Sequence, residues 1–264
     1  MEKSVLITGA SGGMGRATAL YLASRGYRVF ALDIRPLEST ENITYIETDV
    51  TSEDSLCAAL EKIKEQTESL YAVLHFAGIY MLDSLVEIGE AQMRRIFDIN
   101  FFGVYLLNRL VLPLLKKGSR ILITTSELAP LDPLPFTGIY AVTKAALDKY
   151  AYSLAMELQL LGIRVSVLRA GAVETGMLGA STAALEQFCE KTEIYSCNAR
   201  SFRNVVNRVE ARCIPPKRIA EKAEGIIEKR APRFAYSINR NPLLLILNLL
   251  PKRLQCFIIR CILK

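Results

Sequence analysis

Short apolar runs alternate along this chain with longer segments of helical periodicity, and this alternation restricts the possible folds more than any other feature. The strand-like runs are Ser4–Ile7, Arg28–Leu32, Ile43–Glu47, Ala72–His75, Arg120–Thr124, Arg164–Leu168 and, more weakly, Phe234–Ser237. The helical patterns between them include Gly15–Arg25, Ser52–Gln66, Glu90–Leu115 and Tyr140–Leu160. Strands that alternate with helices form βαβ units, whose right-handed crossovers place helices on both faces of a parallel sheet. The sequence therefore predicts an α/β fold with a single doubly wound parallel sheet of about seven strands.

The regular alternation ends after the sixth predicted strand. The stretch from about residue 176 to 214 is helix-like but mixed, and open α/β sheets bind ligands beyond the carboxyl ends of their strands. A long excursion at that edge predicts a lid over a substrate, with an ordinary surface insertion as the alternative. We expect one domain at residues 1–240, which includes this lid, and a C-terminal helical extension at residues 241–264.

The composition excludes several classes of protein. Hydrophobic residues make up 51% and charged residues 23% of the 264, which is typical of a globular protein and not of a disordered one. The single histidine, His75, argues against a histidine-based metal site and against a Ser-His-Asp triad, so no metal is expected. Six cysteines without a CxxC pair indicate reduced thiols, and the apolar strand that begins at Ser4 leaves no room for a signal peptide. We therefore expect a cytoplasmic protein.

A glycine-rich loop joins the first predicted strand to the first helix. It reads Thr8-Gly9-Ala10-Ser11-Gly12-Gly13-Met14-Gly15. The glycines at positions 9, 13 and 15 permit a tight turn, close approach of the backbone to a pyrophosphate, and packing of the helix on the strand. The start of the helix adds unpaired N–H groups and a positive dipole. This context predicts a dinucleotide site.

The second predicted strand ends in an acid, Asp33. A carboxylate at this distance from the loop would accept hydrogen bonds from ribose hydroxyls and would repel a 2′-phosphate. No basic residue lies within Ala10-Ser11-Gly12, where it could meet that phosphate, although Arg35 follows two positions later. The sequence thus favours NAD over NADP, and a turn or cap residue is the alternative for Asp33.

Tyr140 and Lys144 are four residues apart at the start of a helical pattern, which places both side chains on one helical face. A phenol has a pKa near 10 and is a poor base at neutral pH. A cation one turn away, together with the positive charge of a nicotinamide, would favour the phenolate. The pair predicts a proton-transfer site, whereas an exposed helix pair is the alternative.

Taken in order, these motifs resemble the short-chain dehydrogenase/reductase family over residues 4 to about 238. The matching positions are the loop at 8–15, Asp33, Asp49-Val50, Ala77-Gly78, Asn100, Ser126, Tyr140, Lys144 and Thr175. The resemblance implies a Rossmann-type domain, a nicotinamide dinucleotide cofactor, a small-molecule substrate and a homodimer or homotetramer.

The resemblance also implies roles for individual residues. Tyr140 would exchange a proton with the substrate oxygen, and Ser126, rather than its neighbour Thr125, would hydrogen-bond that oxygen. Lys144 would hold the nicotinamide ribose and lower the pKa of Tyr140, while Asn100 would support a water relay. Asp49 and Val50 would frame the adenine, and Val173 and Thr175 would flank the carboxamide. The other implied cofactor contacts are Gly9, Ser11, Gly13, Met14, Gly15, Asp33, Phe76, Ala77, Gly78, Tyr140 and Lys144.

Two positions depart from the family pattern. The chain has His75-Phe76 before Ala77-Gly78 where the family has two asparagines, and Ala170-Gly171 where the family has Pro-Gly. We interpret His75 as a hydrogen-bonded structural histidine. The missing proline would leave the loop over the nicotinamide less restricted, because proline fixes φ.

The C-terminal extension is strongly apolar and basic. Residues 1–190 carry 17 basic and 22 acidic side chains, a net charge of −5, whereas residues 191–264 carry 16 and 5, a net charge of +11. An apolar run ends at Pro251 and is too short to span a bilayer, and Leu254, Phe257, Ile258, Cys261 and Ile262 follow at helical spacing. This pattern is typical of a segment that contacts a membrane peripherally, forms one wall of an apolar substrate pocket, or packs in an oligomer interface. A solvated basic face is the alternative explanation of the charge.

The leading hypothesis is an NAD(P)-dependent oxidoreductase that interconverts a secondary alcohol and a ketone on a lipophilic substrate such as a hydroxysteroid or a retinoid. This substrate class follows from the resemblance, since similar tails occur in family members that act on such alcohols. A 3-oxoacyl-(carrier protein) reductase and a catalytically silent dinucleotide-binding sensor remain as alternatives. Nucleic-acid binding is disfavoured, because the basic residues lack interleaved aromatic residues and a reader motif.

Overall fold

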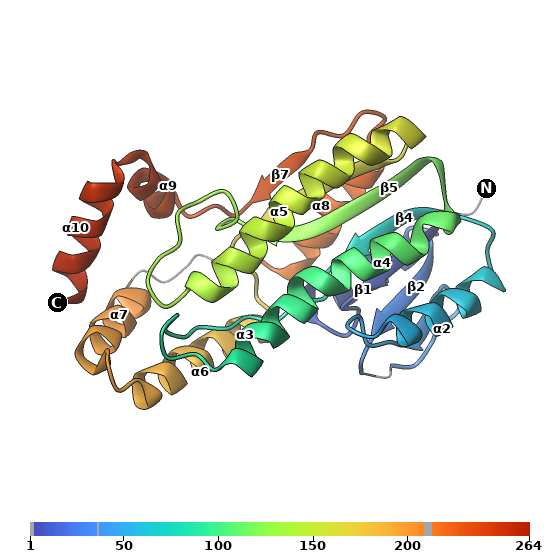
Figure 1. Cartoon of the computed structure of the whole chain (residues 1–264). Helices are drawn as coiled ribbons and strands as arrows, with labels where there is room; N and C mark the ends of the chain where they lie inside the picture. The colour runs from blue at the N-terminus through green and yellow to red at the C-terminus, as the bar shows by residue number, and fades with distance from the viewer. Residues whose placement is uncertain (1–2, 36, 209–212) are drawn as a thin grey trace.

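The computed structural model describes residues 3–35, 37–208 and 213–264. Met1, Glu2, Pro36 and residues 209–212 of the predicted lid lie outside this part of the chain. Seven parallel strands form one sheet in the order β3-β2-β1-β4-β5-β6-β7, with helices on both faces (Figure 1). The strands are β1 (Ser4–Thr8), β2 (Arg28–Asp33), β3 (Ile43–Glu47), β4 (Leu70–His75), β5 (Leu115–Ser126), β6 (Arg164–Ala170) and β7 (Ala235–Ile238). The predicted doubly wound sheet is confirmed.

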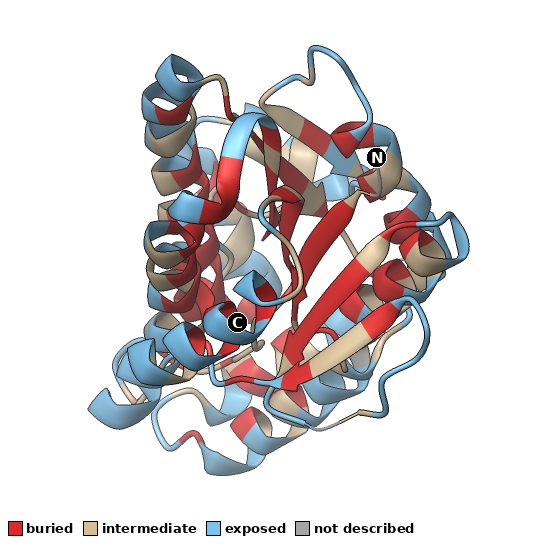
Figure 2. Cartoon of the chain, turned by 90° about the vertical axis from the view of Figure 1, so that its right-hand side faces the viewer, coloured by how far each residue is buried: buried red, intermediate tan, exposed pale blue. Residues whose placement is uncertain are grey.

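Two apolar clusters fill the spaces between the sheet and its helices. Side chains alternate along β1, so that Leu6 enters one cluster and Val5 and Ile7 enter the other. The first cluster joins the sheet to α2 (Glu53–Lys64), α4 (Gly103–Val111) and α5 (Gly138–Leu158). The second joins it to α1 (Gly13–Ser24) and α8 (Pro216–Ile227). The strands are consequently buried along most of their length (Figure 2), which explains their continuous apolar character.

The helical pattern predicted over Glu90–Leu115 consists of four consecutive pieces. These are α3 (Glu90–Phe97), a π-helical turn η1 (Asp98–Phe102), α4, and a 3-10 turn η2 (Leu112–Leu114) that leads directly into β5. Within the described residues, only this run of Glu90–Leu114 is long and apolar enough to cross a membrane by length and composition. Its residues Val104, Leu107 and Val111 lie in the first core cluster, so it acts as a core helix of the sheet.

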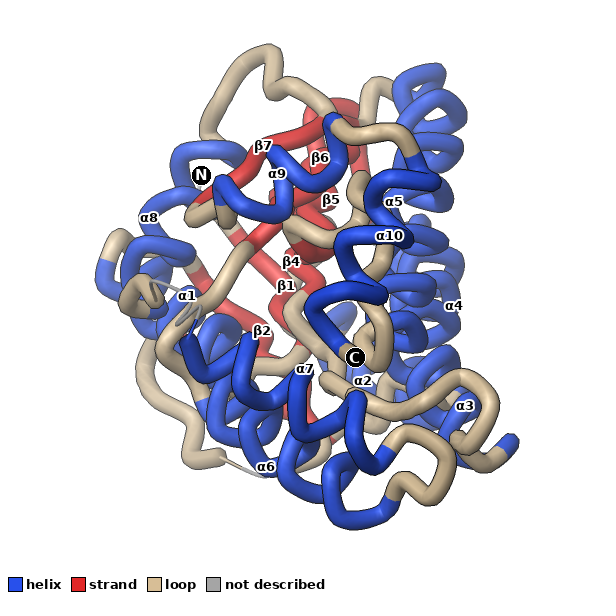
Figure 3. Tube along the Cα trace, turned by 90° about the vertical axis from the view of Figure 1, so that its left-hand side faces the viewer, coloured by secondary structure: helices blue, strands red, loops and turns tan. Residues whose placement is uncertain are grey.

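The predicted lid is helical in its described part. After β6 the chain forms α6 (Gly176–Lys191) and α7 (Ser196–Arg208) before it enters α8. The C-terminal extension forms two helices, α9 (Pro242–Leu249) and α10 (Lys252–Leu263), as predicted. Figures 1 and 3 show α9 and α10 side by side at the end of the molecule that also carries α7. The 3-10 turn η3 (Gln159–Leu161) joins α5 to β6.

Candidate active site

The glycine-rich loop lies between the carboxyl end of β1 and the start of α1. Gly9 has a φ of +68°, and a Cβ atom there would lie 2.5 Å from the backbone nitrogen of Ala77. A Cβ atom on Gly13 would lie 2.5 Å from Cγ2 of Thr175. The structure therefore brings the predicted loop, the strand end at Ala77 and the start of the lid at Thr175 together.

Asp33 ends β2 beside this loop, and its carboxylate accepts two backbone hydrogen bonds. Ser11 N donates to Oδ2 at 3.0 Å, and Arg35 N donates to Oδ1 at 3.1 Å. These bonds fix the carboxylate at the mouth of the loop, where it remains partly exposed. Asp33 thus has both a structural role in the turn and the position that the ribose-binding prediction requires.

The remaining predicted adenine-side residues lie at neighbouring strand ends. Asp49 Oδ1 accepts hydrogen bonds from the backbone nitrogen and the hydroxyl of Thr51 at 2.8 and 2.7 Å. Val50 is buried where Gly103 opens α4, and a Cβ atom at Gly103 would lie 2.9 Å from its Cγ2. Phe76 and Met14 contribute to the second core cluster under the loop.

Tyr140 stands in the first turn of α5 and is buried, with 9% of its surface exposed. Burial raises the pKa of Tyr140 above its usual value, and a hydrogen bond with Ser126 acts in the opposite direction. Ser126, at the end of β5, is buried as well. Thr125 is turned to Asp148, to which its hydroxyl donates at 3.3 Å. Of the two neighbouring hydroxyls, the structure places that of Ser126 at the phenol.

Lys144 lies one turn further along α5. Its Nζ is 5.7 Å from the centre of the Tyr140 ring and donates to the carbonyl oxygen of Thr124 at 3.4 Å. Burial lowers the pKa of Lys144 to about 8, which leaves the ammonium largely charged at neutral pH. A Cβ atom on Gly78 would lie 3.5 Å from this Nζ, so the glycine keeps the surface beside Lys144 open.

Asn100 lies in the π-helical turn η1 and is fully buried. Its Oδ1 accepts from Ile79 N at 2.8 Å, and its Nδ2 donates to Ile79 O at 2.9 Å and to Thr143 Oγ1 at 3.3 Å. π-Helical turns often occur at functional sites because they turn a side chain out of the regular helical register. Here the turn ties the loop after β4 to the helix that carries Lys144.

An aromatic and apolar cluster beside Tyr140, called the roof below, was not predicted from the sequence. The ring of Tyr80 lies 4.9 Å from that of Tyr140, and burial raises the pKa of Tyr80 to about 12. A cluster of buried apolar side chains packs against Tyr80 from other regions of the chain. Its members are Leu82 after β4, Phe136 before α5, Leu185 and Phe188 on α6, Ala199 and Phe202 on α7, and Leu263 on α10. The only sequence signal was the position of Tyr80 two residues after the Ala77-Gly78 motif.

Both departures from the family pattern have a structural explanation. His75 is 2% exposed, its Nε2 lies 2.9 Å from Asn108 Oδ1, and burial lowers its pKa to about 4. These contacts agree with the prediction of a structural histidine. The loop after Ala170 is held by Gly171 N, which donates to Ile238 O at 3.0 Å, and by Asn239 Nδ2, which donates to Ala172 O at 2.8 Å.

Val173, predicted beside the carboxamide, is buried in this loop and pairs with Ile214 in an isolated β-bridge. Residues 3–35, 37–208 and 213–264 contain no group of three or more histidine, cysteine or acidic side chains that could hold a metal ion.

The chain matches proteins of known family. A family model described as short chain dehydrogenase matches residues 3–186. YbbO of Escherichia coli, described as an uncharacterized oxidoreductase, is 35% identical over 66% of this chain and 67% of its own length. The 3-ketodihydrosphingosine reductase of Bacteroides thetaiotaomicron is 26% identical over 87% of this chain and 85% of its own length. Estradiol 17-beta-dehydrogenase 2 of Mus musculus is 32% identical over 67% of this chain and 50% of its own length.

The solved structures agree on the fold. The structure of a short chain dehydrogenase family protein from Francisella tularensis superposes with a TM-score of 0.75 over 90% of this chain and 97% of its own, at 23% identity.

Proposed function

Because the chain belongs to the short-chain dehydrogenase family, we propose that it interconverts a secondary alcohol and a ketone on a lipophilic substrate of hydroxysteroid or retinoid type. The observation that carries this proposal is the arrangement of Ser126, Tyr140 and Lys144 under an apolar roof. A carbonyl oxygen that enters beneath this roof meets two hydroxyl groups and one ammonium group, whereas the rest of the substrate meets apolar side chains.

The nicotinamide dinucleotide, when bound, supplies the hydride acceptor or donor. The residues present fit such a group: Gly9 and Gly13 leave no side chain over the loop, and Gly78 leaves the surface beside Lys144 open. Asp33 would accept hydrogen bonds from the adenosine ribose and disfavour a 2′-phosphate, so we propose NAD as the preferred cofactor.

Tyr140 is the proposed general acid and base. Its burial stabilises the neutral phenol, and this effect has to be offset before the phenol can accept a proton near neutral pH. The ammonium of Lys144 and the hydrogen bond from Ser126 both act in that direction, as would the positive charge of an oxidised nicotinamide. Asn100, which hydrogen-bonds the backbone of Ile79 and the hydroxyl of Thr143, is the proposed support of a proton path to solvent.

Two relatives support the lipophilic substrate class. The names of estradiol 17-beta-dehydrogenase 2 and 3-ketodihydrosphingosine reductase refer to a steroid and to a sphingoid lipid. In this chain the buried apolar cluster of Leu82, Phe136, Phe188 and Phe202 packs against Tyr80, whose ring lies 4.9 Å from that of Tyr140, so the surroundings of Tyr140 are apolar. The same roof disfavours a sensor without substrate, because such a protein would need no apolar cover over its tyrosine.

The test is turnover by Tyr140→Phe on a panel of steroid, retinoid and acyl-thioester substrates with NAD and NADP in parallel. We expect wild-type turnover on a lipophilic class, loss of turnover by at least about a hundredfold in the variant, and retained binding of NADH. Tyr152→Phe, which removes an exposed hydroxyl from the same helix, should leave turnover unchanged. Retained turnover in Tyr140→Phe would remove Tyr140 from its proposed role.

A further inference from the structure

Helix α9 is attached to the protein by its polar residues. Asn241 N donates to Glu127 Oε2 at 2.6 Å, and Asn248 Oδ1 accepts from Asp132 N at 2.6 Å. The apolar residues Leu243, Ile246 and Leu249 lie on the other side, and Leu249 is 84% exposed. A surface helix of a soluble protein normally shows the reverse arrangement, with apolar residues inward. In the described part of the chain, the outward leucine face of α9 therefore faces solvent.

Helix α10 repeats this arrangement and adds positive charge. Gln255 is buried, and its Nε2 donates to Asp132 Oδ2 at 3.1 Å, while Leu254 and Phe257 are exposed. Arg253, Arg260 and Lys264 share a second exposed face at spacings of seven and four residues. For these three cations the described part of the chain shows no ion pair. The outer surface of α10 therefore combines an apolar stripe with an unneutralised basic stripe.

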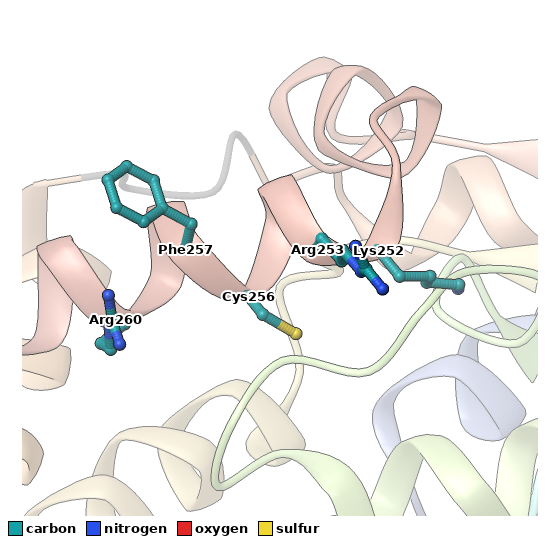
Figure 4. A pocket seen from close by; sticks show the side chains of 5 residues that line it. All are labelled: Lys252, Arg253, Cys256, Phe257 and Arg260. Atoms are coloured by element: carbon teal, nitrogen blue, oxygen red, sulfur yellow. The ribbon is translucent and has the colours of Figure 1, made fainter.

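A shallow groove of ≈ 460 Å³ runs along this surface. Figure 4 shows its lining, which among the described residues comes from α10: Lys252, Arg253, Cys256, Phe257 and Arg260. Lys252 is neutralised by an ion pair with Asp132, and the guanidinium of Arg260 lies 5.8 Å from the ring centre of Phe257. The groove offers cationic groups beside apolar surface, a combination that fits a phosphate group with hydrocarbon attached to it.

The same helix belongs to the roof of the active site. Leu263 and Ile259 pack into the cluster that contains Phe136 and the lid residue Phe202. Asn198 on α7 donates to Leu263 O at 2.7 Å. A molecule bound to the outer face of α10 would therefore lie on a helix that packs into this cluster.

We infer that α9 and α10 form a docking surface for an anionic phospholipid bilayer, with the leucine face of α9 among the acyl chains and the basic stripe of α10 at the phosphates. The docked protein would present its roof to the bilayer, from which a lipophilic substrate can enter. This last step rests on the proposed function, whereas the docking itself does not.

Two other occupants fit the surface less well. A second copy of the chain, docked through the same face, would bring Arg253, Arg260 and Lys264 against their own equivalents, and like charges at an interface disfavour association. An acidic carrier protein would use the cations but would leave the apolar face of α9, including Leu249, in water.

The experiment is flotation of the full-length protein with vesicles of phosphatidylcholine, with and without phosphatidylglycerol. We expect binding to the anionic vesicles at low salt, weaker binding at high salt, and little binding to the neutral vesicles. Leu249→Glu and the double variant Arg253→Glu/Arg260→Glu should each lower the apparent affinity by about tenfold or more.

Two control variants match these changes elsewhere on the surface. Leu160 is 84% exposed like Leu249, so Leu160→Glu tests the same loss of apolar surface. The double variant Lys62→Glu/Arg230→Glu reverses two exposed charges, one on α2 and one after the end of α8. Both should bind vesicles as wild type does, and retained NADH binding should show that every variant is folded.

Three outcomes would overturn the inference. The first is a wild-type protein that stays unbound to anionic vesicles at low salt. The second is an equal loss of binding in the control variants. The third combines two observations: wild type does not bind vesicles, and the variants of α9 and α10 have a lower oligomeric mass by light scattering. This result would assign the surface to a second copy of the chain. None of these results depends on turnover, so the proposed function is tested separately by Tyr140→Phe.

Discussion

At the scale of single residues, burial has opposite consequences for the two ionisable groups of the proton-transfer site. It raises the pKa of Tyr140 and lowers that of Lys144 to about 8, so both changes favour the uncharged forms. The neighbouring side chains, Ser126 and Asn100, are neutral, so they add no charge that would shift either pKa. In the proposed mechanism, the positive charge required at the phenol would come from Lys144 and from an oxidised cofactor together.

Asp33 carries the first prediction at this scale. Asp33→Asn keeps a side-chain acceptor for Ser11 N but removes the negative charge, so a 2′-phosphate is no longer repelled. We expect the ratio of NADP to NAD turnover to rise by about tenfold, which corresponds to about 1.4 kcal/mol. Steady-state kinetics with both cofactors measures this ratio.

Glu47 provides the matched control for Asp33, since it ends β3 and is paired in register with Asp33. Glu47→Gln should leave the cofactor ratio unchanged. If both variants change the ratio equally, the cofactor preference comes from the summed negative charge at this edge of the sheet, and the specific role proposed for Asp33 is contradicted.

His75 carries the second prediction, on stability. Its pKa is about 4 in the folded protein, against 6.5 for an unperturbed histidine, so the unfolded chain binds a proton first as the pH falls. The free energy of unfolding should therefore decrease from about pH 6.5 down to about pH 4, by about 3 kcal/mol at most from this residue. Urea denaturation at pH 7 and pH 5 measures the effect.

His75→Asn introduces the residue type found at this position in the family and removes the only histidine of the chain. The variant should lose the pH dependence of unfolding between pH 7 and pH 5. A variant with the same pH dependence as wild type would show that other groups, such as the carboxylates, cause it.

At the scale of elements, sequence patterns predicted the strands and the loop well because each depends on local properties. Buried parallel strands must be apolar throughout, and the loop needs glycine where backbones approach closely, as at Gly9. The π-helical turn at Asn100 was not predicted, because its cause is tertiary: the amide has to reach Ile79. The roof around Tyr80 was missed for the same reason, since its members come from five separate segments.

Helices α4 and α5 carry the third prediction. They are linked on the outside of the sheet by a ring contact of 6.4 Å between Tyr105 and Tyr150. Exposed apolar side chains lie on this surface, among them Phe102 before α4 and Val142 on α5. We propose that this surface forms the contact of the homodimer or homotetramer that the family resemblance implies.

Val142→Glu should place a charge in that contact and reduce the mass measured by light scattering to that of fewer chains. Leu20→Glu on α1 is the control, because Leu20 is exposed to a similar degree, 50% against 44%, on a different helix. An unchanged mass in Val142→Glu would locate the oligomer contact elsewhere.

At the scale of the whole molecule, the net charge differs between the first 190 residues and the rest of the chain. The predicted cofactor contacts, from Gly9 to Thr175, all lie in residues 1–190, with a net charge of −5. Helix α7 of the predicted lid, α8 and the two terminal helices fall in residues 191–264, with a net charge of +11. The sequence alone left three partners open for the extension. The structure favours an external surface for part of the extension, because Leu249 and Phe257 face solvent.

The strand order β3-β2-β1-β4-β5-β6-β7 has a consequence for how the chain is made. During synthesis the strands emerge in sequence order, and each new strand can pair with a strand at a free edge of the growing sheet. β2 and β3 extend it in one direction from β1, and β4 to β7 extend it in the other. No strand has to insert between two that are already paired. The nascent protein can therefore assemble the half of the sheet that carries the glycine-rich loop before α6 to α10 have been synthesised.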